Sequence, residues 1–411
     1  MTTWTNLPLS KLGTINRGKS KHRPRNDPSL FGGGYPFIQT SDVKHAGFYV
    51  NNYSESYNEI GLAQSKLWPK NTLCMTIAAN IAETALLSFP ACFPDSVVGF
   101  IEDPEKSDVK FIKYSLDHYK KGYQQRSKGA AQDNLSLEKI ESLKLKVPPV
   151  SIQKKIADII FAYDNLIENN EKRIKILEEM AQRLYTEWFV KFKFPGHEKL
   201  RLVNGLPESW EYKRIDDVAR VIRGTSYSSE QINDDYGDYY LVNLKSFNRG
   251  GGFRFDGVKY FNGAVKNNQL LKQGDIVVAV TDMTTDRAVI SRPARIPNIK
   301  SDKITFSADV VRIAPEKLPF AYVYYSLLDY RFTETTKNKA NGANVLHLKP
   351  QAISEYKVFV PTTDLLEKFE RACIGTVKLI DKLSEENEKL SEIRDLLIPQ
   401  LVTGKRKAKV L

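Results

Sequence analysis

An internal duplication is the feature of this 411-residue sequence that most constrains its fold. Residues 9–20 (LSKLGTINRGKS) align with residues 215–226 (IDDVARVIRGTS), and both segments end in Arg-Gly-x-Ser. Residues 164–172 (DNLIENNEK) align with residues 381–389 (DKLSEENEK) and are identical at six of nine positions. Shorter matches between these pairs keep the same order. The series predicts an internal pseudo-two-fold repeat, two copies of one structural plan.

Each copy has a globular part followed by a helical part. In the globular parts, short apolar or aromatic runs are bounded by Gly, Pro, Asn and Asp, which is typical of strands. One helix in each, over about 108–124 and 319–332, adds the α component. We therefore predict a mixed α+β protein, with two globular α/β domains separated by long helices. The expected boundaries are a first domain at 1–150, a central helical spacer at 151–190, a linker at 191–205, a second domain at 206–361, a C-terminal helical spacer at 362–402 and a basic tail at 403–411.

The two helical segments carry apolar residues at seven-residue intervals. Such a heptad seam predicts helix pairing. Two seams of equal length can bury each other as an antiparallel coiled coil; the alternative is that each helix packs only on its own domain. Asn170 and Asn387 occupy equivalent positions, and a polar residue in a seam fixes register at some cost in stability. We expect these two asparagines to set the helix register.

The composition excludes several classes of protein. Hydrophobic residues make up 41% of the chain, which is enough for packed cores and too much for disorder. No apolar run approaches the ~20 residues that cross a bilayer, and the first thirty residues lack the apolar middle of a signal peptide. We expect a cytoplasmic protein without membrane contact. The three cysteines are too far apart in the sequence for a C-x-x-C metal site.

Catalytic motifs are missing from the sequence. It has no P-loop, no Asp-Pro-Pro-Tyr-type loop of amino methyltransferases and no histidine pair with metal-ligand spacing. One loose match, Asp95 and Asp108 with Lys110, fits a nuclease template of two carboxylates and a lysine around a metal, but the second copy lacks it. We predict no active site, no metal and no cofactor, with a stand-alone metal-dependent nuclease as the alternative.

The formal net charge of +12 favours a polyanionic partner. Each globular copy has three polar loops, at 19–27, 39–47 and 126–134 in the first and at 225–234, 243–254 and 337–347 in the second. Lys and Arg in such loops can neutralise phosphates, while Asn, Gln, Ser and Thr can pair with base edges. A repeated framework with unlike loops predicts two different ligands held by one architecture.

From these loops we select candidate DNA-contacting side chains in both copies. In the first copy they are Lys19, Ser20, Lys21, Arg23, Arg25, Gln39, Thr40, Ser41, Arg126, Lys128, Gln132 and Asn134. In the second copy they are Arg223, Thr225, Ser226, Tyr227, Asn243, Lys245, Arg249, Arg254, Asn341 and Asn344.

The whole arrangement resembles the specificity subunits of type I restriction-modification systems. The stretches that carry the resemblance are residues 17–20 (RGKS), 68–73 (WPKNTL), 129–159, 187–196 (EWFVKFKFPG) and 396–406 (LLIPQLVTGKR). The resemblance implies a subunit that makes no covalent change itself. Each globular domain would be a target-recognition domain that reads one half of a bipartite, asymmetric site in double-stranded DNA.

The resemblance also implies partners. Two modification subunits, which bind S-adenosylmethionine and methylate adenines, would dock on this chain, and restriction and translocase subunits would complete the assembly. A spacer of about 40 residues is about 60 Å long at ~1.5 Å per residue, so it could hold two readers one to two ~34 Å duplex turns apart. Helix length would then set the gap between the half-sites.

The sequence departs from the family pattern at two places, and it also fits two other functions. The loop at 225–234 lacks the basic residues of the loop at 19–27, so we expect phosphate contacts in the second domain from Arg249, Arg254 or Lys245 instead. Gln351 and Ala352 interrupt the second copy near its end. The sequence also fits the specificity subunit of a related system with fused modification and cleavage chains, or a two-lobed adaptor that binds proteins through its helices and uses no DNA.

Overall fold

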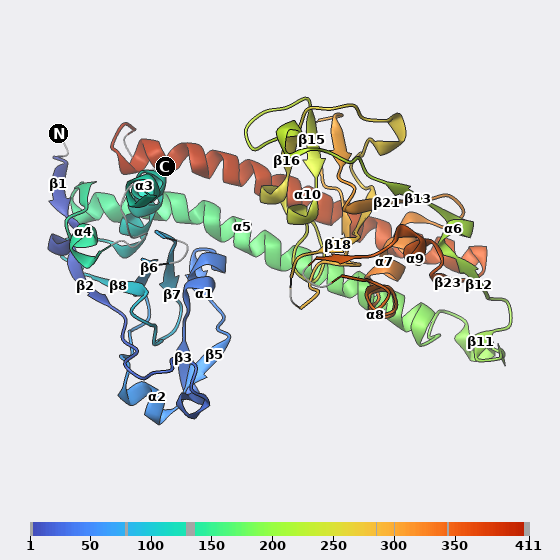
Figure 1. The fold of residues 1–411 in the computed structure, drawn as a ribbon, viewed down its shortest axis with the longest axis horizontal. Helices are drawn as coiled ribbons and strands as arrows, with labels where there is room; N and C mark the ends of the chain where they lie inside the picture. The colour runs from blue at the N-terminus through green and yellow to red at the C-terminus, as the bar shows by residue number, and fades with distance from the viewer. Residues whose placement is uncertain are drawn as a thin grey trace. The chain divides into compact units, whose positions relative to one another are not determined.

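The structure, a computed structural model, describes residues 3–78, 81–128, 136–284, 286–299, 301–342 and 345–406 (Figure 1). The chain forms two compact units. Unit 1 contains residues 1–168 and 388–411, and unit 2 contains residues 169–387. Each unit therefore combines one globular domain with a part of both long helices. Within the described residues, no helix has the length and apolar character that a membrane span requires.

Unit 1 is built on a five-stranded sheet. Its strands, in spatial order, are β2 (Gly13–Arg17), β8 (Val97–Glu102), β6 (Leu73–Thr76), β7 (Thr84–Leu87) and β4 (Tyr49–Val50). Side chains alternate between the two faces of a strand. Leu73 and Met75 accordingly pack in one core with α3 (Val109–Lys128), while Cys74 faces a second core around Trp68.

Smaller elements complete unit 1. They are the strand pairs β1 (Thr5–Pro8) with β9 (Lys144–Val147) and β3 (Phe31–Phe37) with β5 (Glu55–Tyr57), the helices α1 (Thr40–His45), α2 (Glu59–Ala63) and α4 (Leu137–Glu141), and the 3-10 turns η1 (Leu9–Lys11) and η2 (Pro28–Leu30).

Unit 2 contains two four-stranded sheets. The first has the order β13 (Ala219–Arg223), β21 (Val310–Pro315), β17 (Ile276–Ala279) and β19 (Pro293–Arg295); the second has the order β14 (Ile232–Asn233), β16 (Lys259–Phe261), β15 (Tyr239–Val242) and β20 (Ile304–Phe306). Three strand pairs are smaller: β10 (Leu202–Val203) with β11 (Leu206–Pro207), β12 (Glu211–Arg214) with β23 (Lys357–Val360), and β18 (Thr281–Asp282) with β22 (Leu346–His347).

Unit 2 also contains several short helical elements. The α-helices are α6 (Ile215–Val218), α7 (Phe320–Leu328), α8 (Tyr330–Lys337) and α9 (Pro350–Ser354), and the short turns are η3 (Thr186–Val190), η4 (His197–Lys199), η5 (Ser229–Gln231), η6 (Leu244–Ser246), η7 (Phe255–Gly257) and η8 (Asn267–Gln269).

The duplicated motif Arg-Gly-x-Ser has the same geometry in both units. The arginine of the motif is the last residue of β2 in unit 1 and of β13 in unit 2. The glycine N–H donates to a carbonyl at the start of the neighbouring strand: Gly18 to Val97 (2.8 Å) and Gly224 to Val310 (3.3 Å). A Cβ atom would lie 2.3 Å from a backbone oxygen at Gly18 and 2.0 Å from one at Gly224. The close approach of a neighbouring chain segment therefore explains why glycine occupies both positions.

The long helices α5 (Val150–Tyr185) and α10 (Thr363–Val402) pack antiparallel within each unit. In unit 1, Ile156 near the start of α5 shares a core with Leu401 near the end of α10. In unit 2, Tyr185 at the end of α5 shares a core with Phe369 near the start of α10. The same cores contain β-sheet residues, so each helix end packs on a globular domain as well as on the other helix.

Polar contacts accompany this helix pairing. Asn170 donates a hydrogen bond through Nδ2 to Oδ1 of Asn387 (3.0 Å) in unit 2, and Arg394 forms an ion pair with Asp164 (2.7 Å) in unit 1. The expected α+β class with paired antiparallel helices is confirmed. Helix α5 stops at Tyr185, and the chain continues as the π-helical turn η3 to Val190, the residue at which the central helical spacer was expected to end.

Candidate nucleic-acid interface

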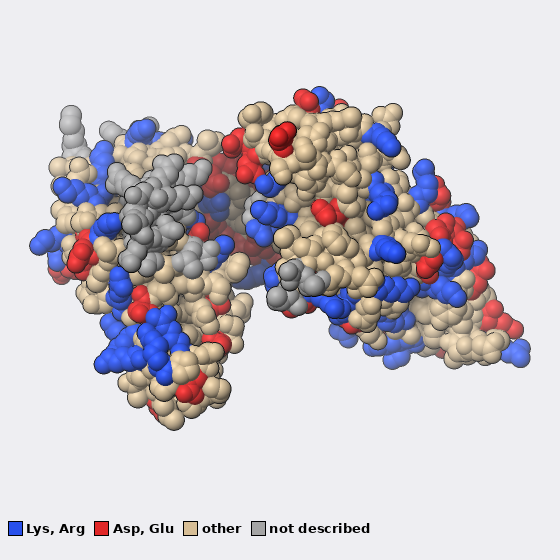
Figure 2. Space-filling view, in the orientation of Figure 1, with Lys and Arg blue, Asp and Glu red and all other residues tan. Residues whose placement is uncertain are grey.

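The loop after β2 presents cations to solvent. Lys19, Lys21, Arg23 and Arg25 are all exposed, and Figure 2 shows Lys and Arg gathered in this part of unit 1, near α2 and β3. The backbone N–H groups of residues 21 and 22 donate to Gln64 Oε1 (2.5 and 3.0 Å), which fixes the loop to α2's C-terminal end. His22 also pairs with Asp27 (2.8 Å), so the loop is held by contacts at both its start and its end while Lys19, Lys21 and Arg23 stay exposed.

Two arginines of this loop differ in their partners. The Arg23 guanidinium donates to two backbone carbonyls, those of Ser20 and His22 (both 2.8 Å), rather than to a carboxylate. The Arg25 guanidinium instead pairs with Asp95 (2.6 Å). Lys19, Lys21 and Arg23 are therefore the stronger candidates for contact with phosphates. Ser20 is buried against the Tyr57 hydroxyl (3.4 Å) and supports the loop from inside.

The segment at 39–47 is a helix rather than a loop. Gln39 precedes α1, and its backbone N–H donates to Asp42 Oδ2 (2.7 Å), which satisfies a free N–H at the helix start. The Gln39 side chain donates to Glu55 (2.5 Å), Thr40 is half-buried and Ser41 is exposed. In the third segment, the backbone of Arg126 and Lys128 belongs to α3, whereas Gln132 and Asn134 lie outside the described residues.

In unit 2 the first loop carries fewer exposed candidates. Arg223 is exposed at the end of β13, and Ser226 and Tyr227 follow it at the surface. Thr225 is buried, and its N–H donates to the Phe306 carbonyl (2.8 Å), which joins the first loop to β20. Burial and the nearby Asp309 carboxylate raise the pKa of Tyr227, so its hydroxyl stays protonated and can donate.

Asn243 has a structural role that the sequence did not reveal. It is buried, its Nδ2 donates to the Gly257 carbonyl (2.9 Å), and its Oδ1 accepts from the Lys245 N–H (2.8 Å). The amide is therefore occupied with closing the loop that follows β15. Lys245, Arg249 and Arg254 are exposed on that same loop.

Three segments of unit 2 meet beside this loop. Arg249 forms an ion pair with Asp286, and the Gly250 N–H donates to the Ala288 carbonyl (2.9 Å), so the loop at 248–254 contacts the segment after β18. Strand β18 pairs with β22, and His347 of β22 exchanges backbone hydrogen bonds with Asn341 (2.8 and 3.0 Å). The loop with Arg249 therefore contacts the segment after β18, and Asn341 contacts β22, the strand that pairs with β18. Asn344 lies outside the described residues.

The segment at 283–288 is a candidate surface that sequence reasoning missed. The buried Asp282 carboxylate accepts hydrogen bonds from the N–H groups of Thr284, Val289 and Ile290 (2.7, 2.8 and 2.8 Å). Burial opposes its ionisation, but the hydrogen bonds outweigh burial and lower the pKa of Asp282. The anchored loop presents Met283, which is 72% exposed, and the exposed Arg287. An Asp followed two residues later by Thr is a turn signal that could have pointed to this loop.

The residues of the nuclease template have structural partners. Asp95 pairs with Arg25, the Asp108 carboxylate accepts the Phe111 N–H (2.9 Å) at the start of α3, and Lys110 Nζ lies 4.1 Å from the centre of the Phe161 ring. Across the described ranges, no group of three His, Cys, Asp or Glu could hold a metal ion. Stability of the fold is a sufficient explanation for all three side chains.

Comparisons with known proteins agree with this picture. The family model described as type I restriction modification DNA specificity domain matches residues 1–179 and 207–383. The chain is 23% identical, over 99% of its length and 94% of the relative's, to the type I restriction enzyme MjaIX specificity subunit of Methanocaldococcus jannaschii. It is 20% identical to the HindI specificity subunit of Haemophilus influenzae, covering 68% of this chain and 72% of that one.

A solved structure shows the same fold. The crystal structure of a type I restriction-modification S subunit from M. genitalium superposes with a TM-score of 0.54 and 16% sequence identity, over 97% of this chain and 96% of that one. The family model and the full-length relative, together with the duplicated domains and paired helices, define this chain as a DNA specificity subunit, a non-catalytic component of a type I restriction-modification enzyme. The chain belongs to the type I restriction-modification DNA specificity family, and the expectations of family and of a non-catalytic subunit are confirmed.

Proposed function

We propose that each globular domain reads one half of a bipartite, asymmetric site in double-stranded DNA. The two domains are residues 1–150 and 206–361, separated by the spacers at 151–190 and 362–402. The observation that carries this proposal is one framework with unlike loops. The glycines of Arg-Gly-x-Ser make equivalent contacts in both units, yet the loop that follows is basic in the first and has no Lys or Arg at 225–234 in the second.

The same proposal assigns roles to partners. Modification subunits, two in number, dock on this chain, bind S-adenosylmethionine and methylate adenines, while restriction and translocase subunits complete the complex in the cytoplasm. The role of this chain is to contact the DNA. Its cations at 19–25, 245–254 and 287 contact phosphates and base edges, since Arg and Lys do both in protein–DNA complexes.

A domain exchange tests the bipartite reading. Residues 1–150 are replaced by the same segment of a related specificity subunit, and methylated adenines are mapped across the genome. We expect one half of the methylated sequence to change and the other to stay. Replacement of residues 206–361 is the matched control and should change the opposite half. A change in both halves, or in neither, would contradict the proposal.

The spacer helices are proposed to set the gap between the half-sites. One heptad inserted into α5 after Asn170, together with one inserted into α10 before Asn387, keeps the hydrogen-bonded pair in register. We expect a longer gap in the methylated site with both half-sites unchanged, because a heptad adds about 10 Å of helix. An unchanged gap in the methylation map would refute the helix-length mechanism.

A further inference from the structure

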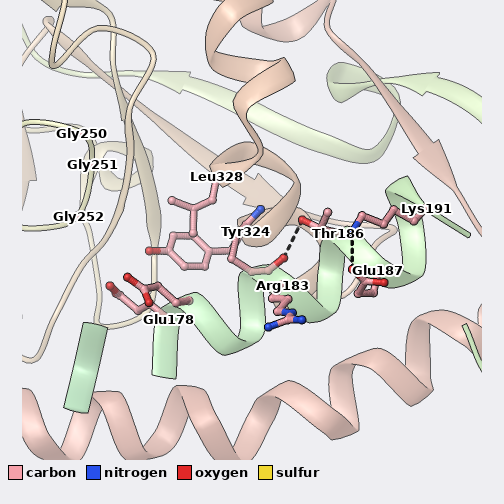
Figure 3. Close-up of a pocket in the computed structure, with 12 residues that line it drawn as sticks. Glu178, Arg183, Thr186, Glu187, Lys191, Gly250, Gly251, Gly252, Tyr324 and Leu328 are labelled. Carbon is pink, nitrogen blue, oxygen red and sulfur yellow. Dashed lines mark hydrogen bonds and ion pairs between the residues drawn. The ribbon is translucent and has the colours of Figure 1, made fainter. Parts of the chain in front are cut away.

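An open pocket of about 620 Å³ lies in unit 2 beside the second half of α5. Its walls come from α5 and η3, from α7 and from the glycines at 250–252 (Figure 3). The three glycines have φ values of +90°, +113° and +87°, a region that favours glycine, and they form a wall without side chains. None of the sequence-based candidates for DNA contact lines this pocket.

Among the described residues, three polar groups of the pocket have no hydrogen-bond partner: the Tyr324 hydroxyl, the Glu178 carboxylate and Gln182 Oε1. The Tyr324 side chain is only 4% exposed, and Figure 3 shows its hydroxyl and the Glu178 carboxylate turned toward the glycine wall. Within the described part of the chain, neither group has a hydrogen bond or an ion pair. Gln182 Oε1 is buried and likewise has no partner among those residues. A buried acceptor without a partner is costly, so this pocket suits a ligand that donates hydrogen bonds.

The charge of the pocket favours a cation. Three carboxylates and two cations line the pocket, and Glu187 pairs with Lys191 (2.6 Å) while Glu179 pairs with Lys175 (3.9 Å). Figure 3 shows the Arg183 guanidinium turned away from Tyr324 and Glu178, so Glu178 is the charged group beside the Tyr324 hydroxyl. Burial raises the pKa of Glu178, although Arg295 opposes this effect, and Arg295 itself pairs with Asp381 (2.5 Å). A guanidinium offers five N–H donors in one plane and can serve several acceptors at once.

Apolar surface next to the pocket points to a protein as the source of that cation. Leu328 and the Tyr324 ring offer an apolar wall to a methylene stem. Ile176 and Met180, one turn apart on α5, are 55% and 61% exposed and lie on the ridge that continues to Arg183. A free cation would leave these side chains in water, whereas a protein surface would cover them.

We propose that this pocket receives an arginine side chain of the modification subunit and so forms part of the docking surface of unit 2. The inference rests on the proposed function, because it takes the modification subunit as the partner that covers this face of α5. Glu178 accepts the guanidinium, and Tyr324 and Gln182 complete its hydrogen bonds.

Reconstitution of the full chain with the modification subunit tests this proposal. We expect Glu178→Gln to raise the dissociation constant about 10- to 100-fold, because a hydrogen bond to a charged group is lost, and Tyr324→Phe to raise it by a smaller factor. Glu367→Gln, an equal change of charge at an exposed position on α10, should leave it unchanged. Thermal unfolding of each variant, compared with the original chain, verifies that the fold is intact.

The outcomes separate the pocket from the wider proposal. If the original chain assembles and Glu178→Gln assembles equally well, the pocket proposal alone is overturned. If free arginine or spermidine raises the melting temperature of the original chain but not of Glu178→Gln, and assembly is unaffected, the pocket binds a small cation instead. A changed methylation sequence in Glu178→Gln would assign the pocket to DNA reading. Failure of the original chain to assemble overturns both proposals.

Discussion

The two globular domains place their cations on different loops of the same framework. In the first, Lys and Arg follow Arg-Gly-x-Ser at 19–25, and the segment after β6 at 77–83 has none. In the second the order is reversed, since 225–234 has none and the segment after β18 contains the exposed Arg287. The shared strands therefore fix where the loops begin, while the loop sequences decide which loop carries exposed cations.

The largest effect is expected from breaking the shared framework itself. Gly18→Ala and Gly224→Ala each push a Cβ against backbone oxygens, 2.3 and 2.0 Å away, so each should cost about 2–4 kcal/mol of unfolding free energy in urea titrations. Gly34→Ala is the matched control, because its Cβ would meet nothing within 4 Å. Equal stability of all three variants would show that the framework does not depend on this contact.

A smaller effect is expected on DNA recognition when a cation is removed from the loop at 283–288 of the second domain. Arg287→Ala removes an exposed cation from the Asp282-anchored loop and should weaken recognition of the second half-site by about 1–3 kcal/mol. Methylation of oligonucleotides with single-base changes in each half-site measures this. Arg220→Ala removes an exposed cation that pairs with Glu316 on β21's C-terminal side and serves as the control. Loss of discrimination in the first half-site instead would reverse our assignment of the loops.

The basic loop of the first domain should contribute mainly through phosphates. Lys21→Ala and Arg23→Ala should each lower the slope of log affinity against log salt by about 1, because each removes one counterion-releasing contact. DNA binding by the assembled complex, titrated between low and moderate salt, gives the slope. Arg25→Ala provides an internal comparison and should change it less, since Asp95 already neutralises Arg25.

The smallest effect concerns the asparagine pair between the helices. Asn170→Ala should destabilise unit 2 by about 1 kcal/mol, because the Asn387 carbonyl oxygen loses a hydrogen bond in a largely buried site. A double-mutant cycle with Asn387→Ala isolates the coupling. A coupling near zero would mean that the pair fixes no register, and the heptad seams alone would then align the helices.

The two-domain architecture with paired helices was predictable, because the internal repeat and the heptad seams can be read directly from the sequence. The paired motif glycines and the two asparagines fall at equivalent points of the structure, since one plan is used twice. The loops were harder to predict. Asn243 is buried because Gly257, which is distant in the sequence, folds back onto it, and the segment at 39–47 is helical because the Asp42 carboxylate accepts the Gln39 N–H.

The loop at 283–288 is a second case in which the sequence alone did not predict a candidate surface. It contains a single arginine, so a search for basic segments passes over it. Its conformation depends on the buried Asp282 carboxylate, which accepts the N–H groups of Val289 and Ile290 and lies on β18, the strand that pairs with the distant β22. Exposure of Met283 and Arg287 is therefore a property of the tertiary fold.

Residues 388–406 are synthesised last, yet they belong to unit 1, which contains the start of the chain. Leu401 and Val402 complete the core that contains Phe111, and Gly404 lies against Trp4, so unit 1 joins segments from both ends of this chain. On the ribosome, unit 2 can acquire all of its residues while unit 1 still waits for its final helix. A chain cut short after residue 387 would therefore be damaged in the half translated first, with the half translated second left whole.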